Sequence, residues 1–123
     1  MYLEELMEEY KEPENFGVMK NYSVTHKDWN SSCGDEIIIY LKIEKEIVKN
    51  IKFQGKGCAI SIVAMSRLSQ ELKGKTVKKV LSFNKEKVLG LLGIEISPMR
   101  LKCALLSLKA VKSAIVRFEN DKN

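Results

Sequence analysis

The chain has 123 residues, 45% hydrophobic and 30% charged, which is the composition of an ordinary globular protein and predicts one domain over residues 1–123. No apolar run reaches the roughly 20 residues of a membrane helix, and the acidic opening Met1-Tyr2-Leu3-Glu4-Glu5 is unlike a signal peptide. These features exclude a membrane span and favour a cytoplasmic protein, in which thiols stay reduced.

The charge is unevenly placed along the chain. Residues 1–14 hold six Glu and one Lys, whereas the remaining chain carries 20 basic and 10 acidic residues. A basic body is able to attract nucleic acid, an anionic surface or an acidic protein. The alternative is a solvated surface without a target, and the scattered lysines favour it. Because the aromatic residues are not clustered either, we expect no nucleic-acid partner.

The first half of the chain predicts one helix followed by strands. Apolar residues recur at helical spacing over residues 3–10, so a short acidic helix is expected to end near Pro13. Residues 19–26 alternate weakly and predict a strand. The β-branched runs at residues 36–43 and 47–54 predict an antiparallel hairpin across a short charged turn.

The second half of the chain is helical in pattern. Helices are predicted at residues 59–72, 77–81, 85–92 and 99–118, with Pro98 near the start of the last one. Because the strands come first and the helices follow, the fold class is α+β rather than alternating α/β.

The long C-terminal helix carries an apolar stripe that we expect to face the core. Its members are Leu101, Ala104, Leu105, Leu108, Val111, Ile115 and Phe118. At about 100° per residue, Cys103 lies roughly 120° from the centre of this stripe. Cys103 is therefore expected to face away from the main core, beside Lys102 and Ser107.

The three cysteines lie in settings that favour a thiolate or a metal ligand. Cys33 follows a polar loop, whereas Cys58 and Cys103 are expected in the first turns of helices, where unpaired N–H groups stabilise a thiolate. An odd number of cysteines argues against a disulfide framework. A small buried side chain is the alternative, and for Cys58 alone it is the favoured one. The three together favour a metal or sulfur site.

Asp35 follows Cys33 by two residues, so both side chains are able to converge on one ion. Three thiolates and a carboxylate are four ligands, the number that zinc and iron–sulfur sites use. The alternative for Asp35 is a turn cap before the strand, and the local sequence leaves both open. No Cys-x-x-Cys pair occurs, which excludes a zinc-finger pattern. His26, the only histidine, is expected on the surface or satisfied in the core.

Four motifs together resemble those of the U-type iron–sulfur cluster scaffold family, which comprises IscU, SufU and the N-terminal domain of NifU. The motifs are Asn15-Phe16-Gly17, Asn30-x-x-Cys33-Gly34-Asp35, Phe53-x-Gly55-x-Gly57-Cys58-Ala59-Ile60-Ser61 and Arg100-x-Lys102-Cys103-Ala104-Leu105. The resemblance runs from about residue 10 to residue 114, and the combination is highly specific.

The resemblance implies a three-stranded antiparallel sheet with helices packed on it. It also implies a scaffold rather than an enzyme, as a monomer or weak dimer. Such a protein accepts persulfide sulfur from a cysteine desulfurase, assembles a labile [2Fe–2S] cluster and passes it to acceptor or carrier proteins.

The resemblance also assigns roles to four residues. Cys33, Cys58 and Cys103 would be the thiolate ligands of the cluster, or of Zn²⁺ in the cluster-free form. Asp35 would be either the fourth zinc ligand or the residue that keeps the cluster labile. Cys33 and Cys103 are the candidate persulfide acceptors.

Three departures from the family separate two hypotheses. Lys102 stands where IscU proteins usually have His, as it does in SufU, which implies a zinc-dependent sulfur acceptor that stimulates the desulfurase and acts as a sulfurtransferase. The insertion that SufU proteins usually carry between the second and third cysteines is absent. Residues 96–100 also replace the Leu-Pro-Pro-Val-Lys segment that a chaperone recognises in IscU. The scaffold is the leading hypothesis, and the zinc-dependent sulfur acceptor is the alternative.

Overall fold

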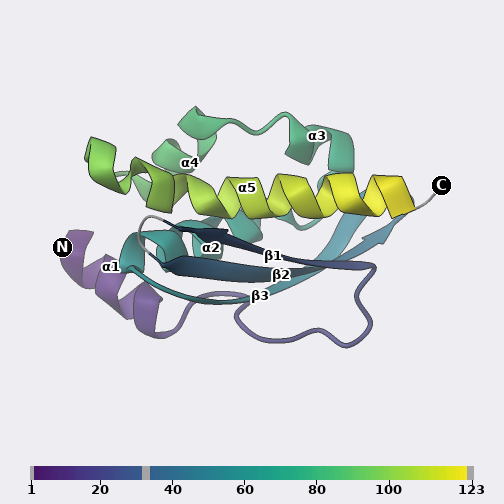
Figure 1. The fold of residues 1–123 in the computed structure, drawn as a ribbon, viewed down its shortest axis with the longest axis horizontal. Coiled ribbons are helices and arrows are strands. Elements are labelled where there is room, and N and C mark those ends of the chain that lie inside the picture. Colours follow the sequence, from purple (N-terminus) through teal and green to yellow (C-terminus); the bar gives the residue numbers. More distant parts are fainter. Residues whose placement is uncertain (1, 32–33, 122–123) are drawn as a thin grey trace.

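The computed structural model describes residues 2–31 and 34–121, with the backbone alone for residues 2 and 3. Figure 1 shows its helices and strands. They are α1 (Tyr2–Lys11), β1 (Val24–Asn30), β2 (Asp35–Glu44), β3 (Ile47–Lys56), α2 (Ala59–Leu72), α3 (Val77–Leu81), α4 (Lys85–Leu92) and α5 (Pro98–Asp121). This arrangement confirms the α+β prediction with a long C-terminal helix. In the described part of the chain, no helix is long and apolar enough to span a bilayer.

The sheet is antiparallel, with the strands in the order β1-β2-β3. The hairpin between β2 and β3 turns at Lys45 and Glu46, whose φ angles of 52° and 63° are left-handed. Two consecutive left-handed residues form the turn whose twist matches that of the flanking strands. The register shifts once between Lys42 and Ile43, and the resulting pairing places Asp35 opposite the end of β3.

The prediction of the first strand at residues 19–26 was wrong in position, because β1 begins at Val24 and ends at Asn30. Its partners on β2 run from Leu41 to Asp35, so pairing with this long apolar strand decides where β1 lies. The buried Asp28 is satisfied by tertiary partners, including Lys109 of α5 at 3.3 Å. A weak local pattern is overridden by such long-range contacts.

The helices cover one face of the sheet. Alternate residues of β2, including Ile37, Ile39 and Leu41, are fully buried on this face. Figure 1 shows α5 lying along the sheet, and α3 and α4 lie against α5 on its other side. Helix α2 contacts α5, β3 and α4 and completes the core.

The predicted stripe of α5 does face the core at Ala104, Leu108, Val111 and Ile115. The prediction that Cys103 faces away from the core was wrong, because α5 is enclosed from two sides. Cys103 and Ser107 are buried, whereas Leu101 and Leu105 of the predicted stripe are only half-buried. The helical spacing of apolar residues predicts burial on one face of a helix only. Helix α5, however, packs against β1 and β2 on one side and against α2 on another. The helix also begins at Pro98, so Cys103 lies in its second turn rather than its first.

Arg67 links helix α1 to two other helices. Arg67 of α2 donates to Glu9 of α1 at 2.9 Å and to the carbonyls of Leu91 and Leu92, each at 2.9 Å. Glu9 also accepts a hydrogen bond from Ser66. These bonds join α1, α2 and the end of α4, whose last carbonyls lack helical partners.

We expect Arg67→Ala to lower the free energy of unfolding by about 1–3 kcal/mol, because it leaves a partly buried carboxylate and two carbonyls without their donor. Hydrogen exchange in α1 should accelerate more than in the sheet. Arg117→Ala is the matched control, since Arg117 is exposed on α5. Equal effects of the two substitutions in chemical denaturation would contradict this role.

Candidate metal and sulfur site

Asp35 lies at the start of β2 on the face that the helices cover, and it is only 1% exposed. Its Oδ1 accepts the backbone N–H of Cys58 at 3.0 Å, and its Oδ2 accepts the hydroxyl of Ser61 at 2.5 Å. The Cys58 thiol lies 3.5 Å from the same Oδ2. The carboxylate therefore joins the sheet to the start of α2.

Cys58 occupies the residue immediately before α2, with extended φ and ψ of −73° and 159°. Its side chain does not cap the helix, so the thiol stays turned toward Asp35 and is half-buried. The first turn of α2 contains no acidic residue of its own. Negative charge on Asp35 or Cys58 is therefore placed against the positive end of the helix dipole.

Cys103 of α5 lies next to Asp35 and Cys58. It is 5% exposed, and its backbone carbonyl lies 3.2 Å from the Ser61 hydroxyl. The ligand atoms of Asp35, Cys58 and Cys103 all lie within 4.8 Å of one another. Of the four residues that the sequence singled out, these three come together, and Cys33 lies outside the described residues.

Gly57 makes the close approach of Asp35 possible. Its φ of 137° is a conformation that side chains disfavour, and a Cβ built there would lie 2.2 Å from Asp35 Oδ1. Its carbonyl also accepts a hydrogen bond from Tyr10 of α1 at 3.4 Å. Residue 57 must therefore be a glycine, because the Asp35 carboxylate occupies the space that a side chain would need.

The donor set suits zinc or iron. Two thiols and a carboxylate combine soft sulfur with hard oxygen, as borderline metals accept. Tetrahedral zinc with ordinary Zn–S bonds separates two sulfurs by about 3.8 Å. Ligand atoms within 4.8 Å reach that spacing through small side-chain rotations, so Asp35, Cys58 and Cys103 fit a metal ion.

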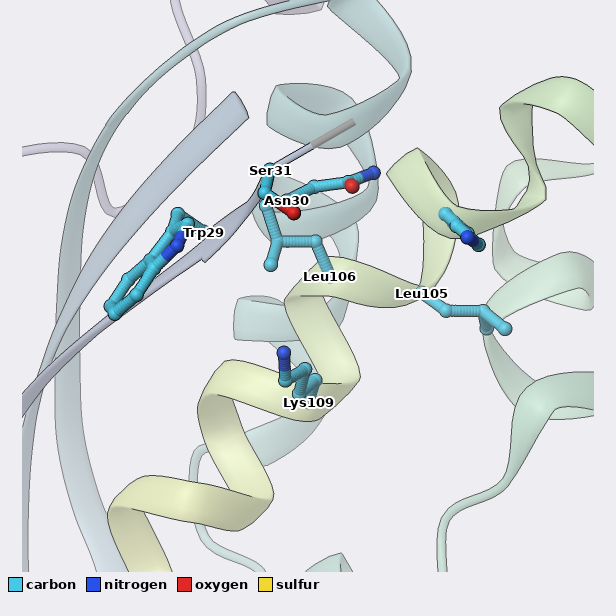
Figure 2. Close-up of a pocket in the computed structure, with 7 residues that line it drawn as sticks. Trp29, Asn30, Ser31, Leu105, Leu106 and Lys109 are labelled. Atoms are coloured by element: carbon cyan, nitrogen blue, oxygen red, sulfur yellow. The ribbon is translucent and has the colours of Figure 1, made fainter. Parts of the chain in front are cut away.

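A pocket of about 370 Å³ flanks α5 next to the chain neighbours of these ligands. Figure 2 shows Trp29, Asn30 and Ser31 on one side of it and Leu105, Leu106 and Lys109 of α5 on the other. Lys102, which precedes Cys103, also lines this pocket. The flank of the site is therefore partly apolar and carries two cations.

Sequence reasoning missed one member of the site. Ser61 was quoted only as part of a motif, yet its hydroxyl contacts Asp35 and Cys103, which lie 26 and 42 residues away in the chain. The one sequence signal was its position three residues after Cys58. His26, whose Nε2 lies 3.5 Å from Asp28, is not among the three grouped ligands.

The family model for the NifU-like N-terminal domain matches residues 1–123. The chain belongs to this family. The family membership that the four motifs predicted is thereby confirmed. The three-stranded antiparallel sheet that the resemblance implied is also the sheet of this structure.

Relatives of this NifU-like domain carry two kinds of name. The zinc-dependent sulfurtransferase SufU of Bacillus subtilis is 32% identical over 97% of this chain and 92% of that protein. The iron–sulfur cluster assembly scaffold protein IscU 1 of Archaeoglobus fulgidus is 30% identical over 96% of this chain and 76% of that protein. The alignment with SufU spans 136 positions, more than the chain has, so SufU contains residues that are absent here.

A solved structure of similar fold comes from Fervidobacterium islandicum AW-1. The protein, FiSufU, is described as a cluster assembly scaffold for the SUF system. It matches the NifU-like domain with a TM-score of 0.76 and 25% identity, over 89% of this chain and 93% of that one.

We expect Gly57→Ala to destabilise the protein by about 2 kcal/mol or more, because the new methyl group collides with Asp35 and the backbone is strained. Gly90→Ala is the control, since Gly90 lies within α4 with open space around it. That substitution should stabilise by up to about 1 kcal/mol. Thermal and denaturant unfolding of both variants measure the difference, and equal stability of the Gly57 variant and the parent would contradict the crowding.

Proposed function

We propose that the chain is a scaffold for iron–sulfur cluster assembly. It accepts sulfur from a cysteine desulfurase, holds a labile [2Fe–2S] cluster as its cargo and passes the cluster to acceptor or carrier proteins. The observation that carries this proposal is the convergence of Asp35, Cys58 and Cys103 in one site of a chain from the NifU-like family. Because the thiols must stay reduced, we infer a cytoplasmic location.

In this proposal each ligand has a distinct role. Cys58 supplies a thiolate from the start of α2 and Cys103 one from the second turn of α5. Cys33, two residues before Asp35 in the sequence, supplies a third. Asp35 contributes an oxygen, which iron binds less firmly than thiolate sulfur. A site with one oxygen ligand therefore binds the cluster but still releases it to an acceptor protein.

The sulfur transfer is a thiol–disulfide type of exchange. A thiolate of Cys33 or Cys103 attacks the outer sulfur of the persulfide on the desulfurase. The new S–S bond forms as the bond to the desulfurase cysteine breaks, and that cysteine leaves as a thiolate. One persulfide is made for one consumed, so no external oxidant or reductant takes part. Lys102 and Lys109 beside the site favour the approach of an anionic sulfur.

Anaerobic incubation with ferrous iron, cysteine, a desulfurase and an excess of a thiol reductant, which reduces persulfide sulfur to sulfide, tests the proposal. The protein should acquire iron and labile sulfide in equal amounts, with the absorption of a [2Fe–2S] cluster. Cys58→Ser and Cys103→Ser should each abolish most of this cluster, since each removes a thiolate. Absence of iron and sulfide from the parent protein under strict anaerobiosis would overturn the scaffold function.

Asp35→Ala should slow transfer of the cluster to an apo-ferredoxin several-fold, because the exchangeable oxygen ligand is lost. The time course of transfer is followed by absorption and circular dichroism. Asp28→Ala is the matched control, since Asp28 is also buried but is paired with Lys109. Faster transfer from the Asp35 variant, or equal changes in both, would contradict the role of Asp35.

A second function is favoured by the similarity to SufU and by Lys102 before Cys103. Here the chain is a zinc-dependent sulfurtransferase, and Asp35, Cys33, Cys58 and Cys103 hold Zn²⁺. Bound zinc would keep the thiols deprotonated and ordered until sulfur arrives.

The two functions differ in what stimulates the desulfurase. If the zinc-dependent function is correct, the zinc form should raise turnover of cysteine to alanine, and removal of zinc by a chelator should abolish the effect. Restoring zinc is the control for damage by the chelator. Equal stimulation by the metal-free protein would exclude this second function while leaving the scaffold function intact.

A further inference from the structure

Ser61 is a polar residue whose hydroxyl lies close to Asp35, Cys58 and Cys103. It is completely buried in the first turn of α2. Its Oγ lies 2.5 Å from Asp35 Oδ2, 3.2 Å from the Cys103 carbonyl oxygen and 3.7 Å from Cys58 Sγ. Its hydroxyl therefore connects β2, α2 and α5 at the centre of the site.

A serine hydroxyl has one proton and donates one hydrogen bond at a time. The Ser61 proton thus has two oxygen acceptors to choose between, the carboxylate of Asp35 and the carbonyl of Cys103, whereas the Cys58 sulfur lies farther away at 3.7 Å. The bond to Asp35 is short, as expected for a hydroxyl that donates to a carboxylate. While it is formed, one lone-pair site of Asp35 Oδ2 is occupied and is not free for a metal ion.

We propose that Ser61 is a positioning residue that controls how readily Asp35 binds and releases a metal ion. With the proton on Asp35, the carboxylate is held against α2. When the hydroxyl turns to the Cys103 carbonyl, Oδ2 is released toward the ion. This inference rests on the proposed function, because it assumes that Asp35 is a ligand.

The second acceptor is what makes such an exchange inexpensive. Neither Ser61 nor Asp35 is accessible to water, so a hydroxyl that lost Asp35 without replacement would be a buried donor with no partner. The Cys103 carbonyl lowers that cost, although the hydroxyl exchanges a charge-assisted hydrogen bond for a weaker neutral one. The hydrogen bond from the Cys58 N–H to Oδ1 is kept meanwhile, so the Asp35 carboxylate stays anchored at one oxygen while Oδ2 moves toward the ion.

The proposal predicts that Ser61→Ala binds zinc more tightly, because Asp35 Oδ2 loses the donor that competes with the metal. The difference between a hydrogen bond to a charged group and one to a carbonyl corresponds to about five- to tenfold in affinity. Zinc affinity is measured by competition with a chromophoric chelator, and release of zinc to that chelator should slow by a similar factor. Ser61→Gly removes the same hydroxyl and should act in the same direction, whereas Ser61→Thr keeps a hydroxyl and should restore parental affinity.

Ser107→Ala is the matched control. Ser107 is also fully buried, lies one turn after Cys103 and donates only to the Ala104 carbonyl, at 3.2 Å, among the contacts of the described chain. Its removal should leave zinc affinity unchanged. An equal rise in the Ser107 and Ser61 variants would attribute the effect to loosened packing and overturn the proposal.

A double-mutant cycle with Asp35→Ala decides whether Ser61 acts through Asp35. Ser61→Ala should change zinc affinity in the parent but not in the Asp35→Ala background. The same change in both backgrounds, or no change in either, overturns the inference and leaves the scaffold function standing. Cobalt provides the separate check, since a parent protein without thiolate-to-cobalt absorption would overturn the proposed function as well.

Discussion

The bond between the Asp35 carboxylate and the N-terminus of α2 is the interaction on which the site depends. It requires a buried carboxylate at the start of a strand, which is costly unless both oxygens are satisfied. The Cys58 N–H and the Ser61 hydroxyl satisfy them, one on each oxygen. Because the same bonds fix the backbone of Cys58, the carboxylate and the thiol are positioned together.

The rest of the fold places helix α5 next to the hydrogen bonds between Asp35 and α2. The hairpin of β2 and β3 sets Asp35 opposite the end of β3, from which the chain enters α2 through Gly57. Helix α5 is enclosed between the sheet and α2, so Cys103 is pressed into the interior. A buried thiol near a helix start and a carboxylate is protected from bulk solvent yet able to bind a metal. Protection and lability in one site are what a carrier of clusters or sulfur needs.

The sequence predicted the local features better than the long-range ones. The helices at residues 59–72, 77–81 and 85–92 agree with the structure because their ends carry local signals, such as the hydroxyl of Thr76 and the amide of Asn84, which cap α3 and α4. The first strand was misplaced because its position depends on pairing with β2. The burial of Cys103 was missed because a single helix does not reveal that two layers enclose it.

In the candidate site, too, the sequence predicted local features but not contacts between distant parts of the chain. Cysteines and an aspartate in loop or helix-start positions indicated thiolate chemistry, and the motifs indicated the family. Neither indicated that Ser61 would lie between Asp35 and Cys103, because both partners come from distant parts of the chain. The role of Gly57, which makes room for Asp35, also depends on a partner from a distant part of the chain.

Metal-edge anomalous diffraction from crystals of the zinc-loaded protein tests the central claim most directly. We expect one zinc ion bonded to a carboxylate oxygen of Asp35 and to the sulfurs of Cys58 and Cys103, with Cys33 as the fourth ligand. A zinc ion bound elsewhere, or bound by the thiolates while Asp35 remains outside bonding distance, would contradict it.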